Sequence, residues 1–259
     1  MFASPQVALV AVERVIAVAV ILQTLELWLV RRVAADDGVW RWPTMRQELP
    51  ARGLLDLLLG YRGFLVLLAA RLAAAVALVF VPHLAMLLVL LATSLLVSLR
   101  WRGSVNGGSD FMTLVVLSAL AVAAAFPTRP MVAVGCLWYI AIQACNSYFL
   151  AGLVKLKSAA WRDGRALPAF LAGAVHDPTV LLRALSRPWL ARAAGYFVIA
   201  LECSFPLALF RPEACAVLVG LALVFHVANV YVFGLNRFLW AWAATYPALF
   251  YCSQAHLGG

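Results

Sequence analysis

Residues 131–154 read MVAVGCLWYIAIQACNSYFLAGLV and are followed at 155–167 by KLKSAAWRDGRAL. The first stretch has no charged side chain and is longer than the roughly 20 apolar residues that cross a bilayer as a helix. Two lysines, a tryptophan and an Asp-Gly turn then end it abruptly. This change is typical of a transmembrane helix that ends at the membrane surface, and it predicts a membrane fold built of helices.

The composition of the whole chain agrees with a membrane protein. Of the 259 residues, 65% are apolar and 12% are charged, whereas soluble domains average about 45–50% and about 25%. A single soluble core cannot bury so much apolar surface, so lipid must solvate most of it. The net charge of +9 would also suit nucleic acid. The arginines lie between apolar runs and not on one helix face, however, which favours lipid headgroups and excludes a nucleic-acid partner.

Further apolar runs of similar length recur along the chain. We expect an all-α integral membrane protein with one transmembrane domain over residues 1–259, a bundle of about eight transmembrane helices plus short interfacial helices. The short helices are expected in the two longer connections, 31–61 and 155–192. The predicted spans are 7–30, 62–80, 82–99, 109–127, 131–154, 193–210, 213–232 and 236–253.

Lysines and arginines lie almost entirely on one side of this predicted bundle. Outside the spans, the opposite side holds only Arg129 and Arg211. By the positive-inside rule the basic connections face the cytoplasm and both termini lie outside. We therefore expect a multi-pass membrane protein. Our expectation for its location is a bacterial inner (plasma) membrane.

Several ionisable or polar residues fall inside the spans, where they are costly unless they face a cavity or a partner. Arg71 needs an internal carboxylate, which Glu202 or Glu26 could supply. His226 and Asn229 are three residues apart and share a helical face. For each residue, structural pairing in the bundle and a role in substrate or proton handling are both open. With no clustered His/Cys set and no CxxC pair, no metal is expected.

A glycine-rich connection, RWRGSVNGGSDFMT at 100–113, is the predicted ligand-facing loop. Asn106, Gly107 and Gly108 favour a turn with positive φ. Ser109 or Asp110 would then cap the next span, and the loop could expose backbone amides to an anion. The alternative is a plain turn, which is the commoner role of Gly-Gly before a helix.

Lys155 is the first charge after the uncharged run, and two interpretations of it are open. It is either an anchor whose amine extends to the headgroups, as at many span ends, or an amine held in a low-dielectric site. Desolvation disfavours the ammonium form, so a buried amine is available as a base or nucleophile. Lys157 is an internal control, because it points to a different side of any continuing helix.

Three ordered stretches resemble one membrane family. They are YFLAGLVKLKSAAWRDGRAL at 148–167, YFVIALECSFPLALF at 196–210 and FHVANVYVFGLNRFLWAWAATYPALFY at 225–251. The first resembles the Tyr…Gly-Leu-x-Lys-Leu…Trp-x-x-Gly motif of the HTTM membrane-domain family, which is related to the membrane domain of vitamin K-dependent γ-glutamyl carboxylase. The other two resemble that domain's mid-span acid and its Phe-His-x-x-Asn segment.

The resemblance implies a reaction. In the carboxylase the motif lysine is implicated in deprotonating reduced vitamin K, oxygen converts the quinol to an epoxide, and a glutamate γ-proton is removed before CO2 adds. By this resemblance Lys155 is the catalytic base, Glu202 and His226 are further catalytic residues, and the cofactor is a vitamin K-like quinone or hydroquinone. Our candidate substrate-binding residues are Asn106, Gly107, Gly108, Asp110, Tyr148, Trp161, Asn229 and Arg71.

Three departures from the carboxylase bear on this reaction. The connection at 100–113 lacks the histidine that the carboxylase has there. We also expect no counterpart of the large domain that holds the carboxylase's peptide, so peptide γ-carboxylation is not expected unless a partner subunit supplies peptide recognition. The carboxylase motif also faces the lumen, whereas the arginine bias puts Lys155 on the cytoplasmic side.

Two hypotheses therefore remain open. The first is a membrane enzyme, or the membrane subunit of one, that acts on a quinol or another lipophilic substrate or in maturation of a peptide. The second is a non-catalytic, transporter-like or assembly protein with structural polar residues.

Overall fold

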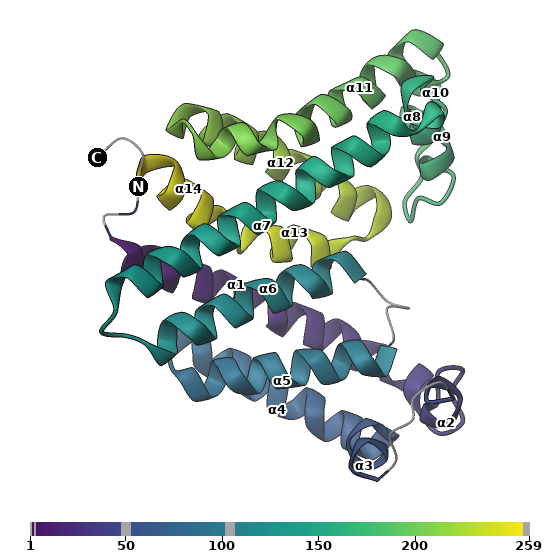
Figure 1. Cartoon of the computed structure of the whole chain (residues 1–259). Helices are drawn as coiled ribbons and strands as arrows, with labels where there is room; N and C mark the ends of the chain where they lie inside the picture. Colours follow the sequence, from purple (N-terminus) through teal and green to yellow (C-terminus); the bar gives the residue numbers. More distant parts are fainter. Residues whose placement is uncertain (1, 3, 48–52, 102–106, 256–259) are drawn as a thin grey trace. The chain divides into compact units, whose positions relative to one another are not determined.

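The computed structural model describes residue 2 and residues 4–47, 53–101 and 107–255, and these residues form helices and no strand (Figure 1). The helices are α1 (Pro5–Leu29), η1 (Arg31–Ala34), α2 (Trp42–Met45), α3 (Leu54–Leu59), α4 (Tyr61–Phe80), α5 (Leu84–Trp101), α6 (Gly107–Ala125), α7 (Pro130–Lys157), α8 (Ala159–Arg162), α9 (Ala166–Leu171), α10 (Thr179–Leu185), α11 (Pro188–Ser204), η2 (Phe205–Leu209), α12 (Pro212–Phe233), α13 (Asn236–Ala243) and α14 (Tyr246–Ala255).

Among the described residues, seven helical segments are long and apolar enough to cross a membrane. They are α1, α4, α5, α6, α7, α11 together with η2, and α12. Several begin with a proline, which is well tolerated at the first helical position because the amide hydrogen it lacks would have no intrahelical partner there. The predicted all-α, multi-pass membrane fold is confirmed, and seven of the eight predicted spans correspond to these segments.

The eighth predicted span, 236–253, is not one helix. α13 ends at Ala243 and α14 begins at Tyr246. Between them, Thr245 donates its amide and its hydroxyl to the Trp242 carbonyl at 2.8 and 2.7 Å. Pro247 is the physical reason, because a proline lacks an amide hydrogen and its ring clashes with the carbonyl four residues earlier, which here belongs to Ala243. Two short helices therefore replace the predicted span.

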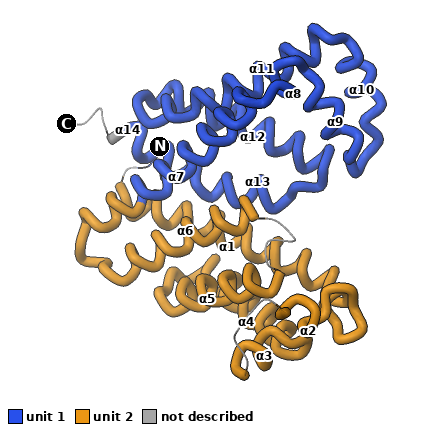
Figure 2. Tube along the Cα trace, turned by 45° about the vertical axis from the view of Figure 1, so that its right-hand side comes forward, with its two compact units in different colours: residues 1–3, 137–259 blue, residues 4–136 orange. Residues whose placement is uncertain are grey.

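The two long connections contain the expected short helices. η1, α2 and α3 lie between α1 and α4, and α8, α9 and α10 lie between α7 and α11. Their position in the headgroup region stays a prediction. The chain divides into two compact units, residues 4–136 (unit 2) and residues 1–3 with 137–259 (unit 1), shown in Figure 2 and described separately here.

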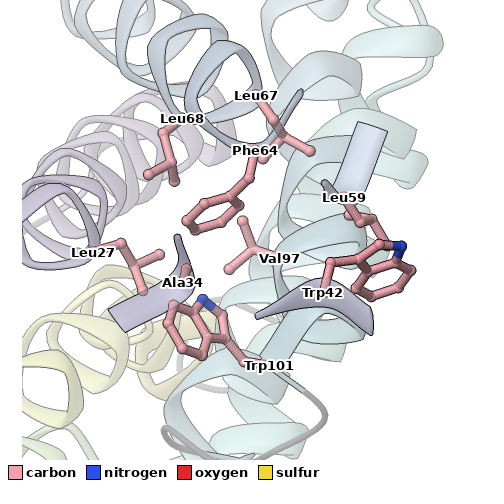
Figure 3. Close-up of a cluster of buried hydrophobic side chains, with 9 residues drawn as sticks. All are labelled: Leu27, Ala34, Trp42, Leu59, Phe64, Leu67, Leu68, Val97 and Trp101. Carbon is pink, nitrogen blue, oxygen red and sulfur yellow. The ribbon is translucent and has the colours of Figure 1, made fainter. Parts of the chain in front are cut away.

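In unit 2, α1 packs against α4 and α6, and α5 packs against both α4 and α6. Buried aromatic and aliphatic side chains fill the end of this bundle where the first connection docks (Figure 3). The cluster consists of Leu27, Ala34, Trp42, Leu59, Phe64, Leu67, Leu68, Val97 and Trp101. It draws side chains from α1, η1, α2, α3, α4 and α5, so the first connection is part of the core of this unit.

Arg100, which is fully buried, joins this connection to α5. Its Nη2 donates to the carbonyls of Ala34 and Trp40 at 3.1 and 2.8 Å. The guanidinium carbon lies 5.5–5.7 Å from the ring centroids of Trp42, Phe64 and Trp101, within cation–π range. Carbonyls and ring faces thus stabilise a buried cation at the end of α5.

A second polar contact joins α2 to α3. Asp56 accepts from Trp42 Nε1 at 2.7 Å and from Arg46 Nη1 at 2.6 Å. These two hydrogen bonds hold the pKa of the Asp56 carboxyl below its ordinary value, because they stabilise the charged form, and the bond from Arg46 has the larger effect.

In unit 1, α11 packs against α8, α9, α10 and α12, and α12 packs against η2, α13 and α14. The part of α7 in this unit contacts α11 through side chains described below. All three stretches that carry the family resemblance, 148–167, 196–210 and 225–251, lie in this unit.

Candidate functional site

Lys155, near the C-terminal end of α7, points towards α11. Its Nζ lies 2.8 Å from Oε1 and 2.7 Å from Oε2 of Glu202, so one ammonium donates to both carboxylate oxygens. The Lys155 side chain is 19% exposed and that of Glu202 is 6% exposed. Lys157, two residues on, is exposed. Of the two directions open to the Lys155 amine, the structure has the one that leads into the protein.

Trp161 supplies a second contact to the same amine. The Nζ of Lys155 lies 5.3 Å from the Trp161 ring centroid, within cation–π range. Trp161 lies on α8 and its ring also packs against Phe170 of α9, with centroids 5.8 Å apart. The short helices after α7 thereby cover the Lys155–Glu202 pair with an aromatic face.

Glycines explain how α7 and α8 come so close to α11. A Cβ built on Gly152 would lie 2.7 Å from Cys203 Sγ, 2.8 Å from Cys203 N and 3.0 Å from Glu202 Cβ. A Cβ on Gly195 would lie 2.7 Å from the Trp161 carbonyl oxygen. Gly164 has φ +85, and a Cβ there would meet the Arg192 nitrogen at 2.7 Å. Small residues at such crossings let helix backbones approach closely.

A buried hydrogen-bonded cluster lies two helical turns before Lys155 on the same face of α7. Tyr148 OH is 2.6 Å from His226 Nε2 and 3.2 Å from Tyr246 OH. The Tyr148 ring stacks on Phe205, with centroids 3.8 Å apart. Tyr148 and Lys155 are seven residues apart, about 10 Å along the axis. The α7–α11 contact thus continues from the ion pair to an aromatic stack.

One nitrogen atom of this cluster has no hydrogen-bond partner among the residues that the structure describes. His226 is 4% exposed, and its Nδ1 is buried without a hydrogen bond. The Trp242 ring lies nearby, with its centroid 5.7 Å from that of the histidine. A buried polar atom without a partner is costly, and it marks a place where a ligand or a water can bind. The neighbouring rings offer an apolar surface beside it.

The other candidate residues of unit 1 are less central. Asn229 is half-buried on α12, and its carbonyl accepts the Leu235 amide at 3.3 Å at the end of that helix. Two residues of the cluster were missed from the sequence, namely Tyr246 and Phe205. Both lie inside the stretches that resemble the family, and a tyrosine hydroxyl in an apolar run was the available signal for Tyr246.

Arg71 and Asp110 belong to unit 2, where they form a separate polar region. Arg71 Nη2 donates to Gln23 Oε1 at 2.9 Å, and Gln23 Nε2 donates to Thr113 Oγ1 at 3.1 Å. Arg71, Asp110, Gln23 and Thr113 help to line a cavity of about 10 Å³, close to the space that one water needs. Both oxygens of Glu202 accept from Lys155, and the pairing of Arg71 with Glu202 or Glu26 stays a prediction.

The residues of the predicted turn before α6 that the structure describes lie inside the helix. Asn106 lies outside the described residues. Gly107 and Gly108 are the first residues of α6, and neither has positive φ, which among the described glycines occurs at Gly53, Gly164 and Gly234. Asp110 does not precede α6 but lies in its first turn. A carboxylate in the first turn still interacts favourably with the helix dipole. The helix begins earlier than a Gly-Gly pair suggests.

The comparisons with known proteins agree with the motifs in unit 1. No curated protein and no solved structure matches the chain. The family model of the HTTM domain matches residues 116–254, more than half of the chain. The match includes Lys155, Glu202, His226 and their surroundings. On this match, the chain belongs to the HTTM domain family.

Proposed function

We propose that this HTTM protein is a membrane enzyme, or the membrane subunit of one, in which Lys155 exchanges a proton with a lipophilic quinol-type substrate. The observation that supports it is the direction of the Lys155 amine, which points into the protein and contacts the Glu202 carboxylate and the Trp161 ring. An anchoring lysine would extend away from the helix bundle. The proposed location is a bacterial inner membrane.

The Lys155–Glu202 pair has the chemistry that a proton acceptor needs. An ammonium cannot accept a proton, so Nζ must first release one. Each Glu202 oxygen lies within hydrogen-bond distance, so transfer from Nζ to Oε leaves a neutral amine beside a carboxylic acid. The amine can then take a proton from a substrate hydroxyl, while Trp161 covers the pair.

We propose that a quinone ring would bind beside the residues two turns away. There Phe205 stacks on Tyr148 and Trp242 lies beside His226, and the His226 Nδ1, which is buried without a hydrogen bond among the described residues, would offer one polar contact to a ring oxygen. Such a group would supply two-electron redox chemistry when bound. His226 and Tyr148 would orient it, and Lys155 would act on its proton. We propose a peptide as the acceptor in a maturation reaction, presented by a partner subunit.

Lys155→Ala and Lys157→Ala form a matched pair for the test. Both remove one positive charge near the end of α7, but only Lys155 contacts Glu202. The assay supplies reduced vitamin K in detergent micelles and measures epoxide and quinone by chromatography, with quinone binding measured in parallel. We expect Lys155→Ala to lower turnover by about 100-fold or more, in the range of general acid–base contributions, and Lys157→Ala to leave it within about twofold. Equal behaviour of the two folded variants would refute the role of Lys155.

A second function has its own supporting observation. Both Glu202 oxygens are already engaged, and Gly152 brings the two helices into contact beside them. That arrangement also suits a non-catalytic transporter-like or assembly protein in which the ion pair holds α7 to α11. The double variant Lys155→Met with Glu202→Leu separates the two functions. If the pair is structural, the double variant should keep both its fold and its activity in cells. If Lys155 is the base, the double variant should keep its fold and lose the activity.

A further inference from the structure

An open cavity of about 360 Å³ lies at the surface of unit 1, where the short helix α8 meets α11. It is lined by Ala159, Arg162, Asp163, Arg192 and Tyr196. Its volume is at the lower end of the range of small-molecule sites, roughly 300–1,000 Å³. None of these residues belongs to the proposed proton-transfer site, so the cavity needs its own explanation.

The cavity carries a net positive charge that its own acid does not cancel. Asp163 is paired with Arg165, whose Nη2 lies 2.7 Å from Oδ2 and whose amide donates to Oδ1 at 3.2 Å. Arg165 is not among the lining residues. Arg192 also interacts electrostatically with Asp163. Three guanidinium groups, those of Arg162, Arg165 and Arg192, thus surround one carboxylate, so the cavity stays net positive.

Backbone contacts hold these two arginines in position. Arg162 Nη1 donates to the Leu156 carbonyl at 3.1 Å, and Arg192 Nε is directed at the Asp163 carbonyl at 3.5 Å. A guanidinium has five N–H donors, so each arginine keeps others for a ligand. The close approach of Gly164 to Arg192 fixes the two segments against each other. Two forked donors facing one cavity form a pattern that recognises phosphate.

The surroundings of the cavity are apolar on the side that continues along α11. Arg192 lies in the second turn of a segment, Pro188–Leu209, that is long and apolar enough to cross a membrane. Trp189 is 66% exposed at its start, as is typical of a residue at the membrane surface. Tyr196 and Phe197, one turn further on, are 48% and 55% exposed. A ligand with an anionic head and apolar chains matches this order of residues.

We propose that this cavity binds an anionic phospholipid, with Arg162 and Arg192 on its phosphate, the Tyr196 hydroxyl at the headgroup and the acyl chains along Phe197. Basic pockets beside membrane helices are suited to such headgroups. The assignment is independent of the chemistry at Lys155. A bound lipid would hold α8, and with it Trp161, against α11.

The test measures lipid retention on the purified full-length protein by native mass spectrometry. The lipids are phosphatidylglycerol and phosphatidylcholine in mixed micelles, and inorganic phosphate alone is a third probe. The wild type should retain phosphatidylglycerol in preference to phosphatidylcholine. Arg162→Gln with Arg192→Gln should weaken retention of phosphatidylglycerol by roughly tenfold to hundredfold, the range expected when hydrogen bonds to a charged group are lost.

Arg183→Gln with Arg187→Gln is the matched control, because it removes the same charge from residues just before α11 that do not line the cavity. A further variant, Ala159→Trp, keeps both arginines but fills the cavity, and it should also reduce retention. The proposal would be overturned if the control and Arg162→Gln with Arg192→Gln lost phosphatidylglycerol retention equally. Undiminished retention in Ala159→Trp would also overturn it. Competition by inorganic phosphate at the same concentration as the lipid would overturn the lipid assignment.

Discussion

Replacing Gly152 with alanine tests whether close packing positions the Lys155–Glu202 pair. The new Cβ would lie 2.8 Å from the Cys203 backbone nitrogen, 0.6 Å short of the 3.4 Å at which ordinary van der Waals contact begins. Backbone cannot rotate away as a side chain can, so α7 and α11 must separate by about that amount. With the side-chain conformations unchanged, the Nζ–Oε distances of 2.7 and 2.8 Å would then grow to about 3.3–3.4 Å, outside the usual hydrogen-bond range of about 2.7–3.2 Å.

The cost can be set against a control within the same unit. Overpacking of this kind typically destabilises a protein by about 1–3 kcal/mol, while Gly→Ala in a helix by itself stabilises by about 0.5–1 kcal/mol. Gly220 in α12 has open space where its Cβ would lie, so Gly220→Ala should show only the stabilising effect. We expect Gly152→Ala to be less stable than Gly220→Ala by about 1–3 kcal/mol.

The assay is thermal unfolding of the purified variants in one detergent, with the fraction folded measured by circular dichroism. Adding Cys203→Ala to Gly152→Ala should not restore stability, because the Cys203 nitrogen and Glu202 Cβ remain in the way. If Gly152→Ala melts at or above the temperature of Gly220→Ala, close approach at this glycine does not position the pair.

Three further changes probe the polar contacts. Lys155→Met alone leaves the buried Glu202 carboxylate without its Lys155 partner and should cost about 3–5 kcal/mol of stability. A second change, Glu202→Leu, should recover most of that loss. A double variant as unstable as the single one would contradict this. Tyr148→Phe removes the hydroxyl that contacts His226 and Tyr246 and should lower the unfolding free energy by about 1–3 kcal/mol, whereas Tyr139→Phe, at an exposed site, should change it little. Because the folded pKa of Asp56 is lowered, its contribution is complete above about pH 4 and is lost as the pH falls through the folded pKa. Asp56→Asn should therefore reduce the protection of the α2 and α3 amides from hydrogen exchange at neutral pH. The variant should also lack the loss of this protection that the wild type shows in acid. An unchanged protection profile would argue against the contact.

The sequence predicts the membrane fold well because hydrophobic length is a local property. Seven spans could be located from apolar runs alone. The short helices in the two long connections could be predicted from the amphipathic composition of those connections. The single helix expected over 236–253 is instead two short helices, because of Pro247, a single residue inside a run that is otherwise apolar enough. The turn expected at Gly107 and Gly108 failed because glycine permits positive φ but does not require it.

The geometry of the site could be predicted only in part. The sequence left the direction of the Lys155 amine open, because an anchor and a buried base have the same residue at the same place. Its partner Glu202 lies 47 positions away, and the contacts of Tyr148 with His226 and Tyr246 span 78 and 98 positions. Such pairs depend on how the helices pack. The resemblance to the HTTM family brought the ion pair and His226 together as candidates, but it did not reveal their contacts.

The burial of Arg100 has a practical consequence for labelling this protein. The segment between α1 and α4 is a long connection between two predicted spans, the kind of place where an epitope tag or a reporter domain is usually inserted. Yet Arg100 holds two of its carbonyls, at Ala34 and Trp40, and Trp42 lies inside the core beneath it. An insertion between Ala34 and Trp42 would separate the arginine from its acceptors and leave a cation in an apolar interior. Topology reporters placed there would therefore describe a damaged protein and not the native one.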